Sequence, residues 1–220
     1  MDIMANGLLA IGASPAMVHA TGELGNAVPI VKAIGGAVSI NIGTLDEHWI
    51  KSFEACVELC KANDVPWVLD PVAAGFTTLR TETAVKLMEI HPPAVLRGNG
   101  SEITALNGAA GGGKGVDSTE GSDAAVGAAK ELAAKFNCVV CVSGATDYIV
   151  AAGGEGPVMT CPHGHEMLTK VTACGKGAWK FVLTRSRKVK LTLLSGTGCL
   201  ISSVIGAFVA ARPEDTTVQE

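Results

Sequence analysis

The sequence has no long uninterrupted apolar run, no broad excess of basic residues and no basic leader at its start. Its longest apolar run, near Leu200 to Ala211, is interrupted by two serines and is too short to span a bilayer. The formal net charge is −4 and basic residues gather only at Lys180 to Lys190, which argues against nucleic acid as a partner. The first residues, Met1 to Gly12, predict the start of a folded element and not a signal peptide. We therefore expect a protein that binds neither membranes nor nucleic acid.

The cysteines indicate neither a disulfide framework nor a zinc site. There are seven, an odd number, in a chain that is not of the small secreted type, so we expect reduced thiols and a cytoplasmic protein. Cys138 and Cys141 have the spacing of a redox or zinc pair, but they flank two valines in an expected strand. Residues three apart in a strand point to opposite faces, and no second cysteine pair completes a site.

What the sequence does contain is an alternation of short apolar runs and helical segments. Its 220 residues, 48% hydrophobic and 17% charged, suit one globular α/β domain. Four runs predict buried parallel strands: Ala37 to Ile42, Trp67 to Leu69, Ala94 to Leu96, and Cys138 to Val142. Three segments predict helices: Asp46 to Asn63 with Asp46 as its N-cap, Thr81 to Ile90, and Ser122 to Phe136. This order predicts a parallel sheet with covering helices.

Polar residues follow each expected strand, where ligands of parallel sheets bind. They are Asn41 and Gly43, then Asp70 and Pro71, then Arg97 to Glu102, and then Ser143 and Gly144. Within the third group, Asn99 and Glu102 form an N-x-x-E pattern that suits water or Mg²⁺ near phosphates, and Asp70 adds a carboxylate. The planar fork of Arg97 suits phosphate oxygens. The alternative is a capping motif at the start of a helix, with Arg97 as a surface charge.

A glycine-rich turn, Ser195 to Cys199, directly precedes the apolar stretch Leu200 to Ala211. Glycines before a helix let backbone N–H groups converge on an anion, and the helix N-terminus adds positive partial charge. A transferring phosphoryl group needs such donors. Cys199 is expected in the first helical turn, where the pKa of a thiol tends to fall. The alternative is a turn that only caps a core helix.

Two further segments are candidates for ligand contact. Met17 ends a loop of small residues, and its polarizable sulfur suits a pocket for an apolar heterocycle, although a plain core position is the alternative. His163 and His165 lack a third metal ligand, so they are interpreted as part of a binding loop or exposed turn.

Taken in order, these segments resemble the hydroxyethylthiazole kinase family of the ribokinase-like superfamily. The matching stretches are Met1–Gly7 running into Gly12–Pro15, Asn41–Leu45, Leu69–Val72, Arg97–Asn99 with Glu102, Lys114–Ser118, Val142–Gly144, His163–His165, Leu168–Thr172 and Gly196–Cys199. The resemblance implies a single ribokinase-like α/β domain over residues 1–220, with helices on both faces of a largely parallel sheet. It also implies ATP-dependent phosphorylation of 4-methyl-5-(2-hydroxyethyl)thiazole in thiamine salvage, with Mg²⁺, in a homotrimer whose thiazole sites lie between subunits.

The resemblance assigns roles to seven residues. Met17 and Gly196 match substrate-binding positions, Arg97 and Ser143 match ATP-binding positions, Asp70 and Glu102 match acidic positions near the metal, and Cys199 is the catalytic candidate. It implies in-line attack of the hydroxyethyl oxygen on the γ-phosphoryl group, with Cys199 taking the proton late. Alternatives are a related kinase, such as one for hydroxymethylpyrimidine, or a hydrate dehydratase. Those enzymes usually carry Asp at the place of Cys199, so the cysteine favours the thiazole.

The chain also departs from the family. We expect it to be truncated at both ends, with a polar tail at Arg212 to Glu220. Residues Ala173 to Ser195 form an atypical basic and apolar insertion next to the glycine-rich turn, which we interpret as translated intron or another gene-model error. A spliced transcript that still encodes Trp179 and Phe181 would overturn that interpretation. These departures leave open a catalytically impaired or non-catalytic kinase fragment.

Overall fold

The computed structural model describes residues 2–109, 125–144, 146–154, 158–161 and 197–211. Several predicted features lie outside the described residues, namely the expected insertion 173–195, the tail 212–220, His163, His165 and Gly196. In chain order the elements are α1 (Asp2–Ala10), α2 (Thr21–Ala33), β1 (Val38–Asn41), α3 (Glu47–Asn63), β2 (Trp67–Asp70), α4 (Thr78–Ile90), β3 (Val95–Asn99), α5 (Gly100–Ala109), α6 (Val126–Phe136), β4 (Val139–Ser143), β5 (Asp147–Val150), β6 (Met159–Cys161) and α7 (Thr197–Ala210). No helix among these is long and apolar enough to cross a membrane.

The six strands described form one sheet in the order β1 to β6. Strands β1 to β4 pair in parallel, and β5 pairs antiparallel with β4 on one side and with β6 on the other. The largely parallel sheet is thus confirmed, and its first four strands are those predicted from the apolar runs. Three strands extend further than those runs and include the polar residues Asp70, Asn99 and Ser143 at their carboxyl ends. The register pairs Asn41 with Asp70 and Asn99 with Ser143, so these side chains start from one edge of the sheet.

Alternate residues of the strands enter two separate hydrophobic clusters, as the two-residue period of a strand requires. Leu69, Leu96 and Val140 join the cluster with buried side chains of α3 to α6, whereas Val68 and Val95 join the one with Ile205 and Val209 of α7. Cys138 and Cys141 fall into different clusters, so their side chains lie on opposite faces of the sheet, as predicted.

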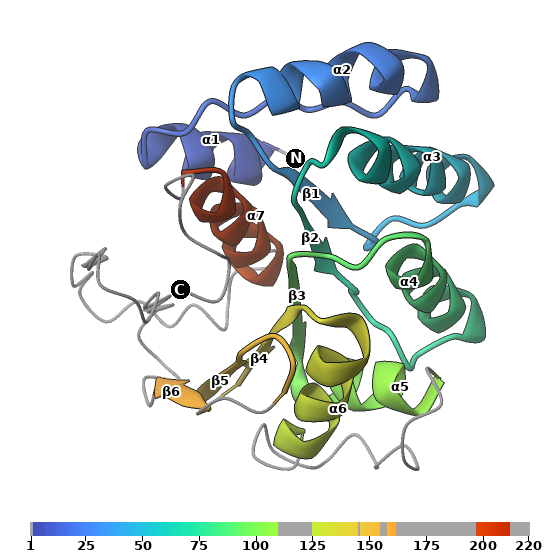
Figure 1. The fold of residues 1–220 in the computed structure, drawn as a ribbon, viewed down its shortest axis with the longest axis vertical. Coiled ribbons are helices and arrows are strands. Elements are labelled where there is room, and N and C mark those ends of the chain that lie inside the picture. The colour runs from blue at the N-terminus through green and yellow to red at the C-terminus, as the bar shows by residue number, and fades with distance from the viewer. Residues whose placement is uncertain (1, 110–124, 145, 155–157, 162–196, 212–220) are drawn as a thin grey trace.

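The strand order explains why the helices divide unequally between the two faces. Crossovers between parallel strands are right-handed, so a strand order that never reverses puts their helices on one face. Figure 1 shows α3 to α6 on that face and α7 on the other, with α1 beside α7 and α2 beside α3. Helices on both faces are thereby confirmed. A Cβ atom on Gly7 of α1 would lie 2.5 Å from Cδ1 of Leu200, so glycine lets α1 approach α7 closely next to Cys199.

The caps fix where two helices begin. Oδ1 of Asp46 accepts the Trp49 N–H at 2.8 Å, which confirms the predicted N-cap of α3. The Thr77 hydroxyl accepts the Arg80 N–H, so α4 begins at Thr78, before the predicted Thr81. This earlier start places Arg80 in the first turn of α4, beside the sheet edge.

Candidate active site

The carboxyl ends of β1 to β4 meet the first turn of α7 at one edge of the sheet. Asp70 and Arg97 both influence the pKa of Cys199, and Arg97 and Glu102 influence that of Asp70. The structure therefore brings together four of the seven predicted site residues, and Ser143 joins them through Arg97.

Asp70 is the most enclosed of these groups, with 1% of its surface exposed. Its Oδ2 atom accepts two hydrogen bonds, from Nδ2 of Asn41 at 2.9 Å and from the hydroxyl of Ser202 at 2.8 Å. Burial raises the pKa of Asp70, and the charge of Glu102 adds to that rise. The positive charge of Arg97 and the two hydrogen bonds act in the opposite direction.

Cys199 is half-buried in the first turn of α7. Burial raises the pKa of its thiol, and the negative charge of Asp70 raises it further, while a hydrogen bond with Asn41 and the charge of Arg97 act against them. The expectation of a lowered thiol pKa is therefore wrong. Loss of water around the sulfur and a nearby carboxylate outweigh the helix terminus, so the neutral thiol predominates at neutral pH.

Arg97 is 9% exposed and comes from the middle of β3, so the alternative of a surface charge is wrong. Its Nη2 donates to the hydroxyl of Ser143 at 2.7 Å, and that hydroxyl donates to the carbonyl of Gly98 at 3.3 Å. Its buried Nε has no hydrogen-bond partner among the described residues. A buried donor without an acceptor is costly, which fits a site that receives an anionic ligand.

Glu102 holds two loops together through both carboxylate oxygens. Oε1 accepts the N–H of Ala73 and Oε2 accepts the N–H of Asn99, each at 2.8 Å. In return, Oδ1 of Asn99 accepts the N–H of Glu102 at 2.9 Å and the hydroxyl of Ser101 at 2.8 Å. The capping arrangement left open from the sequence is thus present at the start of α5. It ties the loop after β2 to the end of β3.

Comparison with known proteins decides the family. The model of the hydroxyethylthiazole kinase family matches residues 1–219. The chain belongs to the hydroxyethylthiazole kinase family. It is 44% identical over 213 residues to a hydroxyethylthiazole kinase of Methanococcus vannielii, a match that covers 96% of this chain and 69% of that protein. A hydroxyethylthiazole kinase of Nitratidesulfovibrio vulgaris is 43% identical, with 96% and 77% covered. The solved structure of a Pyrococcus horikoshii OT3 hydroxyethylthiazole kinase superposes with a TM-score of 0.75 at 33% identity, covering 100% of this chain and 70% of that one.

Two residues at the site of this hydroxyethylthiazole kinase family member were assigned no role from the sequence. Arg80 donates from Nη1 to the carbonyls of Ile42 at 2.9 Å and Val72 at 3.1 Å, and from Nη2 to that of Gly43 at 3.2 Å. It thus clamps the loops after β1 and β2. An arginine in a first helical turn is ordinary, so no sequence pattern distinguished Arg80. The other is Asn41, whose only signal was its place at a strand end.

Of the two predicted substrate residues, the structure describes only Met17. Met17 is in the loop between α1 and α2 and is 41% exposed, so its alternative as a core residue is wrong. Gly196 lies outside the described residues, directly before α7.

Proposed function

We propose that this protein transfers the γ-phosphoryl group of ATP to the primary alcohol of 4-methyl-5-(2-hydroxyethyl)thiazole in thiamine salvage. One observation carries the proposal. A half-buried thiol in the first turn of α7, Cys199, lies in the electrostatic range of a buried acid, Asp70, and of a buried arginine with an unused donor, Arg97. An acid, an arginine and a thiol at the carboxyl ends of the strands suit a site that binds an alcohol next to a polyphosphate.

The reaction we propose is a direct displacement. The alcohol oxygen forms a bond to the γ-phosphorus as the bond from that phosphorus to the ADP oxygen breaks, and no phosphorylated enzyme forms. Cys199 orients the alcohol and accepts its proton late, when bonding to phosphorus has made that proton acidic. The raised pKa of the thiol favours this order, because little thiolate exists before the alcohol attacks.

Arg97 and Ser143 are the proposed contacts of ATP. The Arg97 guanidinium is held by the Ser143 hydroxyl at 2.7 Å, which leaves Nε as a donor for a phosphate oxygen. Met17 and Gly196 remain the proposed contacts of the thiazole. Exposure of Met17 fits a contact that is completed from outside this protomer.

The carboxylates fit a hydrated Mg²⁺. Among the described residues, no group of three or more His, Cys, Asp or Glu side chains forms a protein cage for a metal ion. Magnesium does not need one, since it keeps several waters and binds through one or two carboxylates and substrate phosphates. Asp70 would hold the ion and Glu102 its water. Burial raises the pKa of Asp70 and the charge of Glu102 adds to that rise, so a bound cation would favour the ionised carboxylate. The bound ion would neutralise charge on the phosphoryl group.

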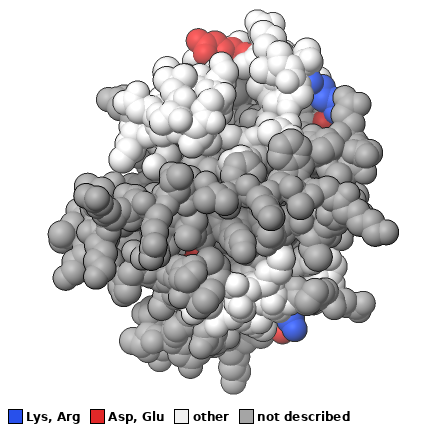
Figure 2. Space-filling view, turned by 90° about the vertical axis from the view of Figure 1, so that its left-hand side faces the viewer, with Lys and Arg blue, Asp and Glu red and all other residues white. Residues whose placement is uncertain are grey.

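We propose a cytoplasmic homotrimer with an apolar contact surface on α1 and α2. Large apolar side chains are exposed on these helices and on the residues next to them, namely Ile3, Leu9, Ile11, Val18, Ile30 and Ile34. The described surface at the top of Figure 2, where α1 and α2 lie, is mostly uncharged. Light scattering after size-exclusion chromatography should give three times the chain mass of 22.4 kDa. A monomer at micromolar concentration would contradict the proposal.

The experiment that tests the function is a coupled assay of ADP release by the full 220-residue chain. We expect ADP release that depends on hydroxyethylthiazole, with the phosphorylated alcohol identified by mass spectrometry. Hydroxymethylpyrimidine is the comparison substrate, and Cys199→Ala serves as the control for contaminating kinases. Preference for hydroxymethylpyrimidine would overturn the substrate assignment. A folded chain that releases ADP with neither alcohol would favour the non-catalytic fragment.

A further inference from the structure

We propose that Trp49, in the first turn of α3, is a positioning residue that holds the Met17 segment in place for the thiazole. The Met17 segment is the connection of residues 11–20 between α1 and α2. The proposal rests on the proposed contact of Met17 with the substrate, and it names the residue on which that contact depends.

The Met17 segment has little of its own to fix its middle part. Residues 12–16 read Gly-Ala-Ser-Pro-Ala, so this part carries only small side chains. Backbone hydrogen bonds of 3.0 Å attach its ends, through Ala13 to the last turn of α1 and through Ala20 to the first turn of α2. Residues 13–20 form no helix or strand, and Met17 is 41% exposed. A binding residue on such a segment needs support from another element.

That support comes from α3, through the ring and the carbonyl of His19. The centroid of the His19 ring lies 6.2 Å from that of Trp49, with 45° between the ring planes. The carbonyl of His19 accepts the hydroxyl of Ser52, a buried residue, at 3.3 Å. Trp49 and Ser52 are three residues apart, so both lie on one face of the helix. Because Met17 precedes His19 by two residues, its Cα can lie no more than about 7 Å from that of His19.

Trp49 is itself held in place. Its N–H donates to Oδ1 of Asp46, the N-cap of α3, at 2.8 Å. Its ring stacks on that of Phe53, with centroids 5.3 Å apart and 30° between the planes. Phe53 follows by four residues, the spacing at which side chains of a helix meet. The half-buried Trp49 ring is therefore a firm surface on which His19 can rest.

The first turn of α3 also belongs to the edge of the sheet where the site lies. Only residues 42–46 separate the end of β1 from the start of α3, so the helix begins beside the carboxyl end of its strand. Two carbonyls of this connection, those of Ile42 and Gly43, accept hydrogen bonds from Arg80 at 2.9 and 3.2 Å. Trp49 thus couples the Met17 segment to a part of the chain that is fixed at the strand ends.

The kinetic consequence follows from where the thiazole ring lies relative to the reaction. A contact with that ring is distant from the bonds that form and break, so it is the same before and during the displacement. Loss of such a contact raises KM and leaves kcat unchanged. A segment without its support must also be ordered when the substrate binds, and that ordering weakens binding.

A double-mutant cycle on KM tests the proposal. We expect Trp49→Leu to raise KM for hydroxyethylthiazole roughly 3- to 10-fold, with kcat and KM for ATP changed by less than about 2-fold. In the Met17→Ala background the same substitution should add less than about 2-fold, because Trp49 acts through Met17. Equal rises in both backgrounds, or an unchanged KM in the first, would overturn the proposal.

His19→Ala provides a second route that leaves α3 intact, and His48→Ala is its matched control. The His48 ring also contacts that of Trp49, at 6.5 Å and 67°, but His48 belongs to α3 and not to the Met17 segment. We expect His19→Ala to raise KM for the thiazole as Trp49→Leu does, and His48→Ala to leave it within about 2-fold. Thermal melts check that each variant is folded. Equal rises for the two histidine variants would contradict the proposal.

Denaturation in urea tests the contact between His19 and Trp49 without turnover. Residues in contact have non-additive effects, so the midpoint for combined His19→Ala and Trp49→Leu should fall by less than the sum of the two single falls. If the wild type turns over no hydroxyethylthiazole but the falls are non-additive, the proposed function fails and the support of the segment stands. Additive falls would overturn the support itself.

Discussion

The hydroxyl of Ser202 donates to Oδ2 of Asp70 at 2.8 Å across a separation of 132 residues in the chain. Both side chains are 1% exposed, so the bond is enclosed. It joins the second turn of α7 to the carboxyl end of β2, on the face of the sheet opposite helices α3 to α6. One hydroxyl thereby contributes both to the docking of a helix and to the environment of an acid.

Replacing that hydroxyl should weaken docking and catalysis together. We expect Ser202→Ala to lower the free energy of unfolding by about 1 to 3 kcal/mol, because a buried acceptor loses a donor. Denaturation in urea measures the loss. Ser203→Ala is the control, since the Ser203 hydroxyl bonds only to the carbonyl of Cys199 in its own helix, at 3.1 Å. Equal stability of the two variants would contradict the prediction.

Asp70→Asn should stabilise the fold at neutral pH while it lowers turnover. Burial raises the folded-state pKa of Asp70 above its usual value, so the folded state binds the proton more tightly than the unfolded state. The stability associated with this group is present at low pH and is lost as pH rises through the folded pKa. The neutral amide avoids that loss. Unfolding free energies measured without Mg²⁺ from pH 4 to 8 should diverge between wild type and variant as pH rises.

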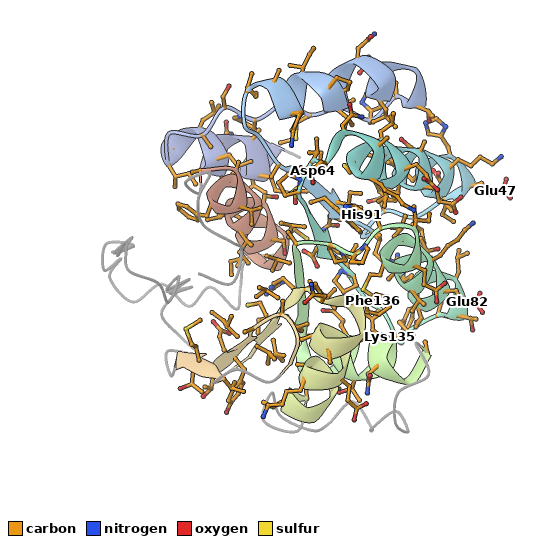
Figure 3. All side chains as sticks on the ribbon, in the orientation of Figure 1. Glu47, Asp64, Glu82, His91, Lys135 and Phe136 are labelled. Atoms are coloured by element: carbon orange, nitrogen blue, oxygen red, sulfur yellow. The ribbon has the colours of Figure 1, made fainter. Side chains whose placement is uncertain are left out.

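Asp64→Asn is the control for that experiment. Asp64 is exposed, pairs with Lys32 at 3.0 Å, and lies near His91 before the amino ends of the strands (Figure 3). A pair so exposed contributes little, so we expect its variant to follow the wild-type profile. If the free energy of unfolding of Asp70→Asn ran parallel to that of wild type across this pH range, ionisation of Asp70 would not destabilise the fold, and the prediction would be wrong.

Arg80→Met should loosen the loops after β1 and β2. Three carbonyls lose their donor, and we expect a loss of about 1 to 3 kcal/mol in stability together with lower kcat. Arg80→Lys should restore little, because an ammonium lacks the planar fork that reaches several carbonyls. Lys86→Met, which breaks only a pair with Glu54, is the control for removal of a positive charge from α4. Full rescue by lysine would contradict the clamp.

Among the five cysteines whose side chains are described, Cys199 should be alkylated first. Cys56, Cys60, Cys138 and Cys141 are buried, and burial raises the pKa of Cys138 and Cys141 to about 12. Iodoacetamide at pH 8, followed by peptide mapping, measures the order. ATP with hydroxyethylthiazole should protect Cys199. Earlier labelling of Cys138 or Cys141 would contradict the burial of that strand.

Cys199→Ala should lower kcat by about 10-fold or more while ATP affinity stays within about 3-fold. The sulfur is the proposed partner of the alcohol and has no proposed contact with ATP. Single-turnover rates and ATP titration by fluorescence separate the two effects. Unchanged turnover would remove the proposed role of this residue.

Strands β2 to β4 were predictable because they are mostly buried on both faces, so their sequences are continuous apolar runs. Strand β1, at the edge of the sheet, was found from the same kind of run although only Ile40 in it is fully buried. The short strands β5 and β6 were not predicted, because four and three residues carry too little pattern. Nor was α2, whose sequence contains Pro29 and two glycines, residues that usually argue against a helix. Its packing against α3 outweighs that preference.

The part of the site that lies at the carboxyl ends of the parallel strands was predictable, because these ends meet at one edge of the sheet. Asp70 and Arg97 were found this way, because the rule depends only on strand direction. Cys199 was found from the glycine-rich turn that precedes an apolar stretch. The contact between Asn41 and Gly43, and the clamp by Arg80, depend on side-chain geometry between separate segments. The predicted direction of the Cys199 pKa shift was wrong for the same reason, since the burial of the thiol and the neighbouring charge of Asp70 depend on the tertiary fold.

The unequal division of the helices has a consequence for synthesis on the ribosome. Residues up to β4 include all the parallel strands and the helices of one face, whereas α7 follows them in the sequence. Until α7 emerges, the apolar residues Val68, Val95 and Val139 have no helix to cover them. The same helix carries the sulfur, so a nascent chain cannot hold a competent site while that face is still bare. Quality control that detects exposed apolar surface would therefore also detect every inactive precursor of this kind.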